Sequence, residues 1–130
     1  MPLSSLGKAS AIARVALDGL AEDAVILDMR RVASFCDYFV ICQARSPLHI
    51  DAIHDRVIEA MAQEGLHSPR REGGRNSTWV VLDYGDVVLH IFDEPTRAFY
   101  DLERLWSDAR RVNLAGEPGD AESDRGDRGA

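Results

Sequence analysis

Two strand-like runs that meet at Tyr84-Gly85 constrain the fold of this chain more than any other feature of its sequence. The runs are TWVVLD (78–83) and DVVLHIF (86–92), and both are rich in β-branched and aromatic residues, which strands favour. Glycine supplies the positive φ that a tight connection requires. The stretch therefore predicts a β-hairpin.

A hairpin loop made of Tyr84 and Gly85 alone places Asp83 opposite Asp86, and Trp79 opposite His90. Because side chains alternate along a strand, each strand then contributes to two faces. The more apolar face is expected to carry Thr78, Val80, Leu82, Val87, Leu89 and Ile91. The other face is expected to carry Trp79, Val81, Asp83, Asp86, Val88 and His90. A one-residue slip on one strand would reverse its faces, so the assignment depends on the turn.

Two further runs have the character of buried strands. Residues 24–29 and 38–44 are apolar at successive positions, which predicts strands that are covered on both faces. Residues 67–77 are polar, basic and glycine-bearing, which is typical of a loop with at most a short edge strand.

Three segments have the apolar periodicity of helices. Residues 4–21 show it, and residues 46–64 begin with Ser-Pro, a cap residue followed by proline in the first turn. Residues 95–111 form the last predicted helix. Its apolar stripe is expected to consist of Ala98, Phe99, Leu102, Leu105, Trp106 and Ala109. The elements together predict an α/β fold, with a mixed β-sheet flanked by helices and a C-terminal hairpin and helix.

Length and charge limit the organisation and the partners. A chain of 130 residues is expected to form one domain, which we place at residues 1–112. Residues 113–130 are acidic and lack large apolar side chains from Ala115 onward, which predicts a disordered tail. The formal charge of −7 argues against strong nucleic-acid binding and favours a basic protein partner. No signal peptide or membrane-spanning run is evident, so we expect a soluble, cytoplasmic protein.

The candidate chemical groups have ordinary structural interpretations. Asp83 and Asp86 have the spacing of a metal or acid–base pair, but carboxylates beside Tyr-Gly are common turn residues. His90 is interpreted as a packed or interface histidine, because no metal-type spacing accompanies it. Cys36 and Cys42 are expected to be buried free thiols. We therefore expect no catalytic residue, no metal and no cofactor.

Other polar and aromatic side chains leave alternatives open. Arg70, Arg71 and Arg75 form a basic cluster that is interpreted as a solvated loop rather than a phosphate contact. Trp106 falls within the apolar stripe and is expected to pack. Tyr100 points nearly opposite the stripe, where contact with a partner is the alternative to simple exposure.

Three blocks, in order along the chain, carry a family resemblance. They are Asp37-Tyr38-Phe39-Val40-Ile41, then WVVLDYGDVV (79–88) continued by His90, and finally Arg97 with FYDLE (99–103) and Leu105-Trp106. On these blocks the chain resembles the ribosomal silencing factors, the RsfS or Iojap family, over roughly residues 6–110. Cys36 and Ala44 depart from the family pattern, in which a small hydroxyl residue and a glycine are frequent.

The resemblance implies a nucleotidyltransferase-like α/β fold without its catalytic signature. It implies a protein that is not an enzyme and that binds the large ribosomal subunit through a basic protein of the intersubunit face. There it would sterically block joining of the small subunit and so repress translation, and a role in large-subunit biogenesis is also attributed to relatives.

The docking surface is predicted from polar and aromatic residues within these blocks. The predicted partner-binding residues are Asp37, Tyr38, Trp79, Asp83, Tyr84, His90 and Tyr100. Two alternatives remain open at this point. One is a working nucleotidyltransferase, which needs paired carboxylates on Mg²⁺ after a glycine-serine turn; EGGRNS (72–77) lacks them. The other is a self-associating module that forms a homodimer away from the ribosome.

Overall fold

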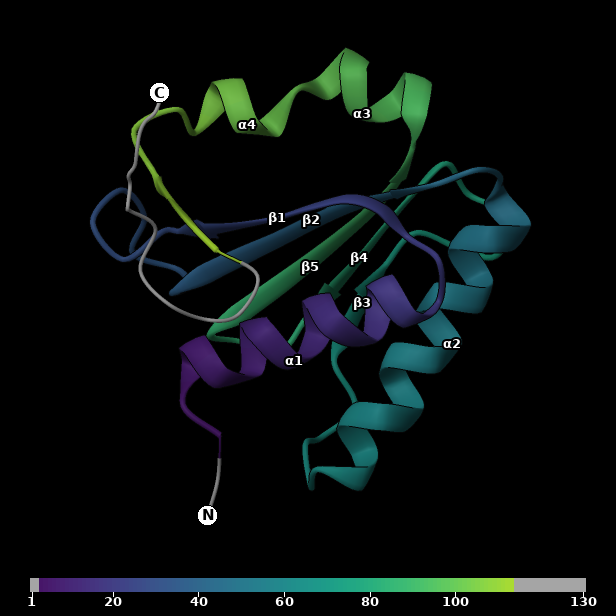
Figure 1. The fold of residues 1–130 in the computed structure, drawn as a ribbon, viewed down its shortest axis with the longest axis horizontal. Helices are drawn as coiled ribbons and strands as arrows, with labels where there is room; N and C mark the ends of the chain where they lie inside the picture. Colours follow the sequence, from purple (N-terminus) through teal and green to yellow (C-terminus); the bar gives the residue numbers. More distant parts are fainter. Residues whose placement is uncertain (1–2, 114–130) are drawn as a thin grey trace.

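A single mixed sheet organises the protein, and helices lie on both sides of it (Figure 1). The computed structural model describes residues 3–113. The strands are β1 (Glu22–Asp28), β2 (Tyr38–Ala44), β3 (Arg70–Glu72), β4 (Trp79–Asp83), β5 (Val87–Asp93) and β6 (Arg110–Val112). The helices are α1 (Ser5–Asp18), α2 (Pro47–Gln63), α3 (Glu94–Tyr100) and α4 (Leu102–Leu105).

The strands lie in the order β3-β4-β5-β2-β1-β6. The β2–β5 pair is parallel, and the other neighbouring strands are antiparallel. This arrangement confirms the predicted α/β class with a mixed sheet flanked by helices. The predicted tail lies outside the described residues except for Asn113. Among residues 3–113, no helix combines the length and apolar character needed to cross a membrane.

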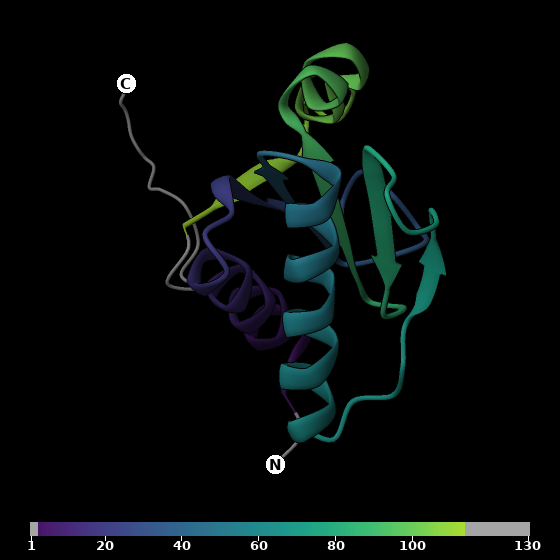
Figure 2. The same cartoon turned by 90° about the vertical axis from the view of Figure 1, so that its right-hand side faces the viewer.

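Helices α1 and α2 cover one face of the sheet (Figure 2). Their apolar stripes pack on the inward side chains of β2, β4 and β5, and this layer forms the larger core cluster. The Ser46 hydroxyl accepts a hydrogen bond from the His49 amide at 3.1 Å, and Pro47 occupies the first turn. The predicted start of α2 is therefore confirmed, and β2, which is buried along its whole length, is covered on both faces as expected.

The hairpin register differs from the prediction by two residues. Asp83 pairs with Val88 and Trp79 with Phe92, so the predicted pairs Asp83–Asp86 and Trp79–His90 are wrong. The Tyr84 amide donates to the Val87 carbonyl at 2.9 Å, which keeps Tyr84 in the ladder and moves the loop to Gly85-Asp86. Because the displacement is an even number of residues, the predicted division into two faces still holds.

Asp86 has a structural role that explains this register. Its carbonyl accepts hydrogen bonds from the amides of Asp37 and Tyr38 at 2.7 and 3.1 Å. Its carboxylate pairs with Lys8 of α1 at 2.7 Å. The loop is therefore fixed to the start of β2 and to α1, and these contacts require Asp86 at the tip.

The predicted helix over 95–111 is wrong beyond Tyr100. Asp101 adopts a left-handed conformation with φ of 48° and separates α3 from α4. Residues Arg110–Val112 then form β6 and pair with β1, because the edge of that strand offers backbone groups that need partners. Arg97, rather than an apolar residue, is the buried side chain of α3.

Gly73 gives a prediction about the hairpin. Its φ is +96°, and an added Cβ would lie 2.6 Å from the Trp79 carbonyl oxygen. We expect Gly73→Ala to lower the free energy of unfolding by about 3 kcal/mol, because backbone strain adds to a steric collision. Gly85→Ala is the matched control, since Gly85 has φ of +92° and no atom within 4 Å of the added Cβ. It should cost about 1 kcal/mol. Urea denaturation compares the two, and equal losses would contradict the collision.

Candidate functional site

The face of the sheet opposite α1 and α2 carries a cluster of aromatic and apolar side chains that is partly open to solvent. We call this surface the aromatic face. It consists of Phe35, Trp79, Phe99, Tyr100, Leu105 and Trp106. Phe99 is 81% exposed, Leu105 69%, Phe35 59% and Tyr100 48%. An exposed apolar patch of this kind is typical of an interaction site.

A buried layer of rings supports the aromatic face. Trp79 stacks on Phe92 with ring centroids 4.8 Å apart, and its ring lies 4.6 Å from that of Tyr100. Phe39 contacts His90 at 4.5 Å and Trp106 at 6.2 Å. Phe35, Trp106 and Tyr100 are therefore held by ring contacts with residues of β2 and β4, which gives them the rigidity that anchor residues need.

His90 belongs to this supporting layer. Its side chain is only 7% exposed, and burial lowers its pKa to about 4. The Trp79 indole N–H donates to His90 Nδ1 at 3.2 Å, so Nδ1 must remain unprotonated. Nε2 is buried and has no hydrogen-bond partner among the described residues. A neutral, enclosed imidazole fits the packed interpretation of this histidine.

The structure divides the predicted partner-binding residues between two sides of the sheet. Trp79 and His90 lie on the side of the aromatic face, and Tyr100 packs against Trp79. Asp83 lies on the same side, because side chains alternate along β4 and because Asp83 pairs with Val88, which packs on that side. Trp79, His90 and Tyr100 are in contact, and Asp83 lies on the same side of the sheet at the hairpin end of β4.

Tyr38 and Tyr84 lie on the opposite side, in or against the core beneath α1 and α2. Tyr38 is 3% exposed and lies under the Arg30 guanidinium, 5.4 Å from its ring centroid. Burial raises the pKa of Tyr84 to about 12. Asp37 is half-buried where the chain enters β2. The predicted set therefore does not form one continuous surface.

Sequence reasoning missed three exposed members of the aromatic face. Phe99 and Leu105 were expected in the apolar stripe of one long helix, and Phe35 was not considered. The break at Asp101 turns Phe99 and Leu105 outward, and Arg97 takes the inward position, where it donates to Gln43 at 3.3 Å and to Glu103 at 2.8 Å. Aspartate tolerates the left-handed region better than most residues, which is the only local signal for the break.

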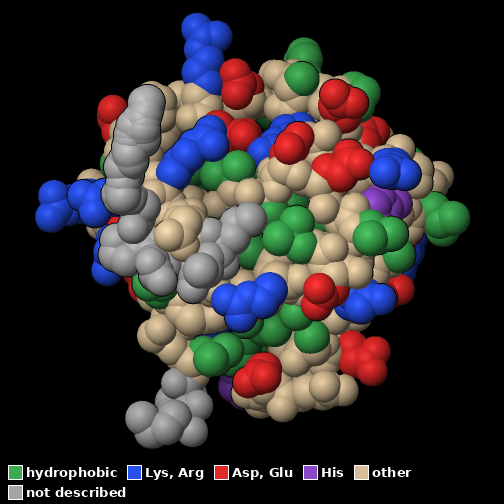
Figure 3. Space-filling model, viewed as in Figure 1, with side chains coloured by type: hydrophobic (Ala, Val, Ile, Leu, Met, Phe, Trp, Pro, Cys, Tyr) green, Lys and Arg blue, Asp and Glu red, His purple; other side chains and the backbone are tan. Residues whose placement is uncertain are grey.

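Charged side chains lie beside the aromatic face. Asp101 and Arg104 line one surface hollow together with Phe99. Asp83 on β4 lies on this side of the sheet, and Glu72 on β3 pairs with Val81 of the same side. Figure 3 shows hydrophobic side chains beside acidic ones along the edge formed by α3. An apolar centre with carboxylates beside it is complementary to Lys and Arg on a partner surface.

The carboxylates and thiols have structural partners or environments. Asp83 Oδ1 accepts the Gly85 amide at 2.8 Å, which confirms the turn interpretation, and Asp86 pairs with Lys8. Cys36 and Cys42 are buried and free, as predicted, and burial raises their pKa to about 11 and about 12. Within the described part of the chain, no three His, Cys, Asp or Glu side chains gather in a way that would hold a metal.

Comparisons with known proteins agree with this picture. Residues 2–129 match the protein family described as "Ribosomal silencing factor during starvation". The ribosomal silencing factor RsfS of Halalkalibacterium halodurans is 38% identical over 99 residues, which cover 76% of this chain and 85% of that protein. The chloroplastic protein Iojap of Arabidopsis thaliana is 34% identical over 110 residues, covering 85% of this chain and 46% of that protein.

A solved structure supports the fold. A crystal structure from Bacillus halodurans superposes with a TM-score of 0.66 at 35% identity, covering 73% of this chain and 89% of that one. The sequence match spans nearly the whole chain, and the fold matches over most of it. This protein therefore belongs to the RsfS family of ribosomal silencing factors.

Proposed function

We propose that this protein represses translation by binding the large ribosomal subunit and sterically blocking the small subunit from joining it. The aromatic face is the docking surface, and the partner is a basic protein of the intersubunit face. The proposal is carried by an exposed aromatic patch with carboxylates beside it, on a chain of a family named for ribosomal silencing. The protein acts by occupying space in the cytoplasm, without catalysis or a cofactor, and a role in large-subunit biogenesis fits the same contact.

The structure favours an adjusted set of contact residues. Trp79, Asp83 and Tyr100 stay in the proposed contact, together with the exposed Phe99 and Leu105. Tyr38, Tyr84 and His90 act by supporting the strands, because their side chains are buried or face the other side of the sheet. Asp37 directly precedes the central strand β2, and its amide donates to the Asp86 carbonyl and holds the hairpin loop.

Co-sedimentation with purified large subunits, paired with a subunit-joining assay, tests this function. We expect the protein to pellet with large subunits near physiological salt and to lower the yield of joined ribosomes. An excess of the protein over large subunits should inhibit joining fully, because the blockage is steric. No association, or undiminished joining despite full occupancy, would overturn the proposal.

Self-association is a second use of the same surface. Exposed apolar groups from two copies can cover each other, so the free protein is proposed to form a homodimer that competes with ribosome binding. Mass measurement over a dilution series, with and without large subunits, tests this. Large subunits should shift the equilibrium toward monomer, whereas a dimer that binds subunits intact would contradict competition.

A further inference from the structure

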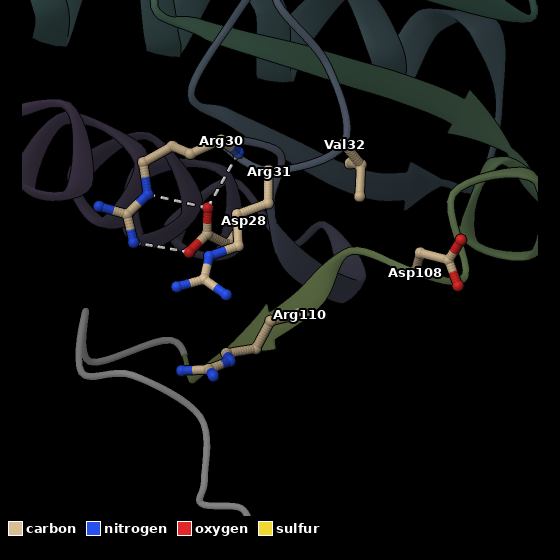
Figure 4. Close-up of a pocket in the computed structure, with 6 residues that line it drawn as sticks. All are labelled: Asp28, Arg30, Arg31, Val32, Asp108 and Arg110. Carbon is tan, nitrogen blue, oxygen red and sulfur yellow. Dashed lines mark hydrogen bonds and ion pairs between the residues drawn. The ribbon is translucent and has the colours of Figure 1, made fainter.

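Three arginine side chains gather at the edge of the sheet where β1 pairs with β6. They line a cavity of about 240 Å³ together with Asp28, Val32 and Asp108 (Figure 4). Arg30 and Arg31 lie two and three residues beyond the end of β1, and Arg110 on β6 is the pairing partner of Asp28. We call this the arginine cavity. It lies outside the aromatic face and has no part in the function argued so far.

The charge in the arginine cavity is unbalanced. Arg30 engages both oxygens of Asp28, through Nε at 2.9 Å and Nη2 at 2.7 Å, and its amide adds a third hydrogen bond at 3.1 Å. The side chains of Arg31 and Arg110 have no hydrogen-bonded or ion-paired partner among the described residues. The Arg30 hydrogen bonds, and Arg110 at longer range, hold the pKa of Asp28 below its usual range. Both oxygens of Asp28 are therefore engaged by Arg30, and the cavity lining holds three guanidinium groups against the two carboxylates of Asp28 and Asp108.

The Arg31 and Arg110 guanidinium groups are available to a ligand, because neither has a side-chain partner among the described residues. In the view of Figure 4 the Arg31 guanidinium group lies between the Asp28 carboxylate and Arg110, whereas the Asp108 carboxylate lies apart from them. Both arginines are exposed. Like charges placed together cost free energy unless a counter-ion joins them, and a guanidinium group matches a phosphate with two parallel hydrogen bonds. In a protein with a formal charge of −7, such a site favours one local anion rather than a broad nucleic-acid surface.

We propose that the arginine cavity binds a backbone phosphate of ribosomal RNA when the aromatic face docks on its protein partner. This inference rests on the proposed function, because an RNA surface is what lies beside a protein on a ribosomal subunit. Val32 connects the two sites, since it lines the cavity and packs on the same buried cluster as Trp106. The aromatic face thus supplies most of the affinity, and the cavity fixes the orientation by one phosphate contact.

The double variant Arg31→Gln with Arg110→Gln tests the contact. We expect roughly tenfold weaker binding to large subunits. The plot of log affinity against log salt should become shallower by about 1, because about one phosphate is no longer neutralised. Arg30 is kept, since it pairs with Asp28 and covers Tyr38. Thermal unfolding should be unchanged, because the two replaced side chains are exposed.

The matched control is Arg45→Gln with Arg56→Gln, which removes the same charge from exposed positions near α2. It should bind as the wild type does. Equal weakening of both double variants would reduce the effect to overall charge and overturn the proposal, as would unchanged binding of the cavity variant.

A second measurement keeps this inference separate from the proposed function. Inorganic phosphate is titrated into the full chain, and the Nε–H resonances of Arg31 and Arg110 are followed by NMR against chloride at equal ionic strength. A shift that phosphate causes and chloride does not supports an anion site, even if the wild type fails to bind large subunits. That failure would overturn the proposed function and the RNA source, but not the anion site. A phosphate shift with undiminished subunit binding of the cavity variant would assign the site to free phosphate and overturn the RNA source. No shift would overturn the phosphate site itself.

Discussion

Replacing Tyr100 with alanine is expected to weaken binding to the large ribosomal subunit by about 30-fold, while the fold stays intact. Tyr100 is half exposed and rests on Trp79 at 4.6 Å, so it presents a rigid ring with little entropy to lose. Aromatic anchors of this kind contribute about 2 kcal/mol or more in interfaces. Co-sedimentation over a range of protein concentrations measures the change, and subunit joining should recover in proportion.

Leu48→Ala provides the control for that result. Leu48 is as exposed an apolar residue as those of the aromatic face, but it lies on α2, on the other side of the sheet. Its loss should leave binding unchanged. The reverse pattern, with Tyr100→Ala binding normally and Leu48→Ala binding weakly, would move the docking surface to the face formed by the helices.

Strands β1, β2, β4 and β5 could be predicted from the sequence because their signals are local. Branched apolar runs mark β2 and β5, Ser46-Pro47 marks the start of α2, and the alternation of side chains divides the hairpin into its two faces. Even a register error of two residues preserved those faces, since the side-chain period of a strand is two. The buried half of the fold was therefore accessible to pattern reasoning.

The aromatic face was less accessible because it depends on contacts between distant segments. Whether Phe99 and Leu105 are buried depends on the left-handed residue Asp101 and on the pairing of β6 with β1. Neither has a distinctive local pattern. Likewise, Arg110 meets Asp28 only through that strand pair, so the arginine cavity has no signature in the order of the residues.

His90 makes the stability of this protein depend on pH. In the folded protein its pKa is about 4, whereas the ordinary value is 6.5. Between these values the unfolded chain binds more protons, so the free energy of unfolding falls as the pH is lowered. The loss should be roughly 2 kcal/mol between about pH 7.5 and about pH 5. The physical cause is burial, and protonation would also remove the acceptor that Trp79 uses.

His90→Asn isolates this contribution, because asparagine offers an acceptor oxygen near the position of Nδ1 and does not titrate. The variant will be less stable at neutral pH, but its stability should change little between about pH 7.5 and about pH 5. Carboxylates do not produce the same change of the free energy of unfolding with pH. Hydrogen bonds from Arg30 and Arg75 lower the pKa of Asp28 and Asp55. The stability that these two carboxylates contribute is therefore lost only below about pH 4. Urea denaturation at a series of pH values compares the two proteins. A slope that persists in His90→Asn would place the titrating group elsewhere, whereas its loss would show that the histidine beneath the aromatic face is neutral in the folded state.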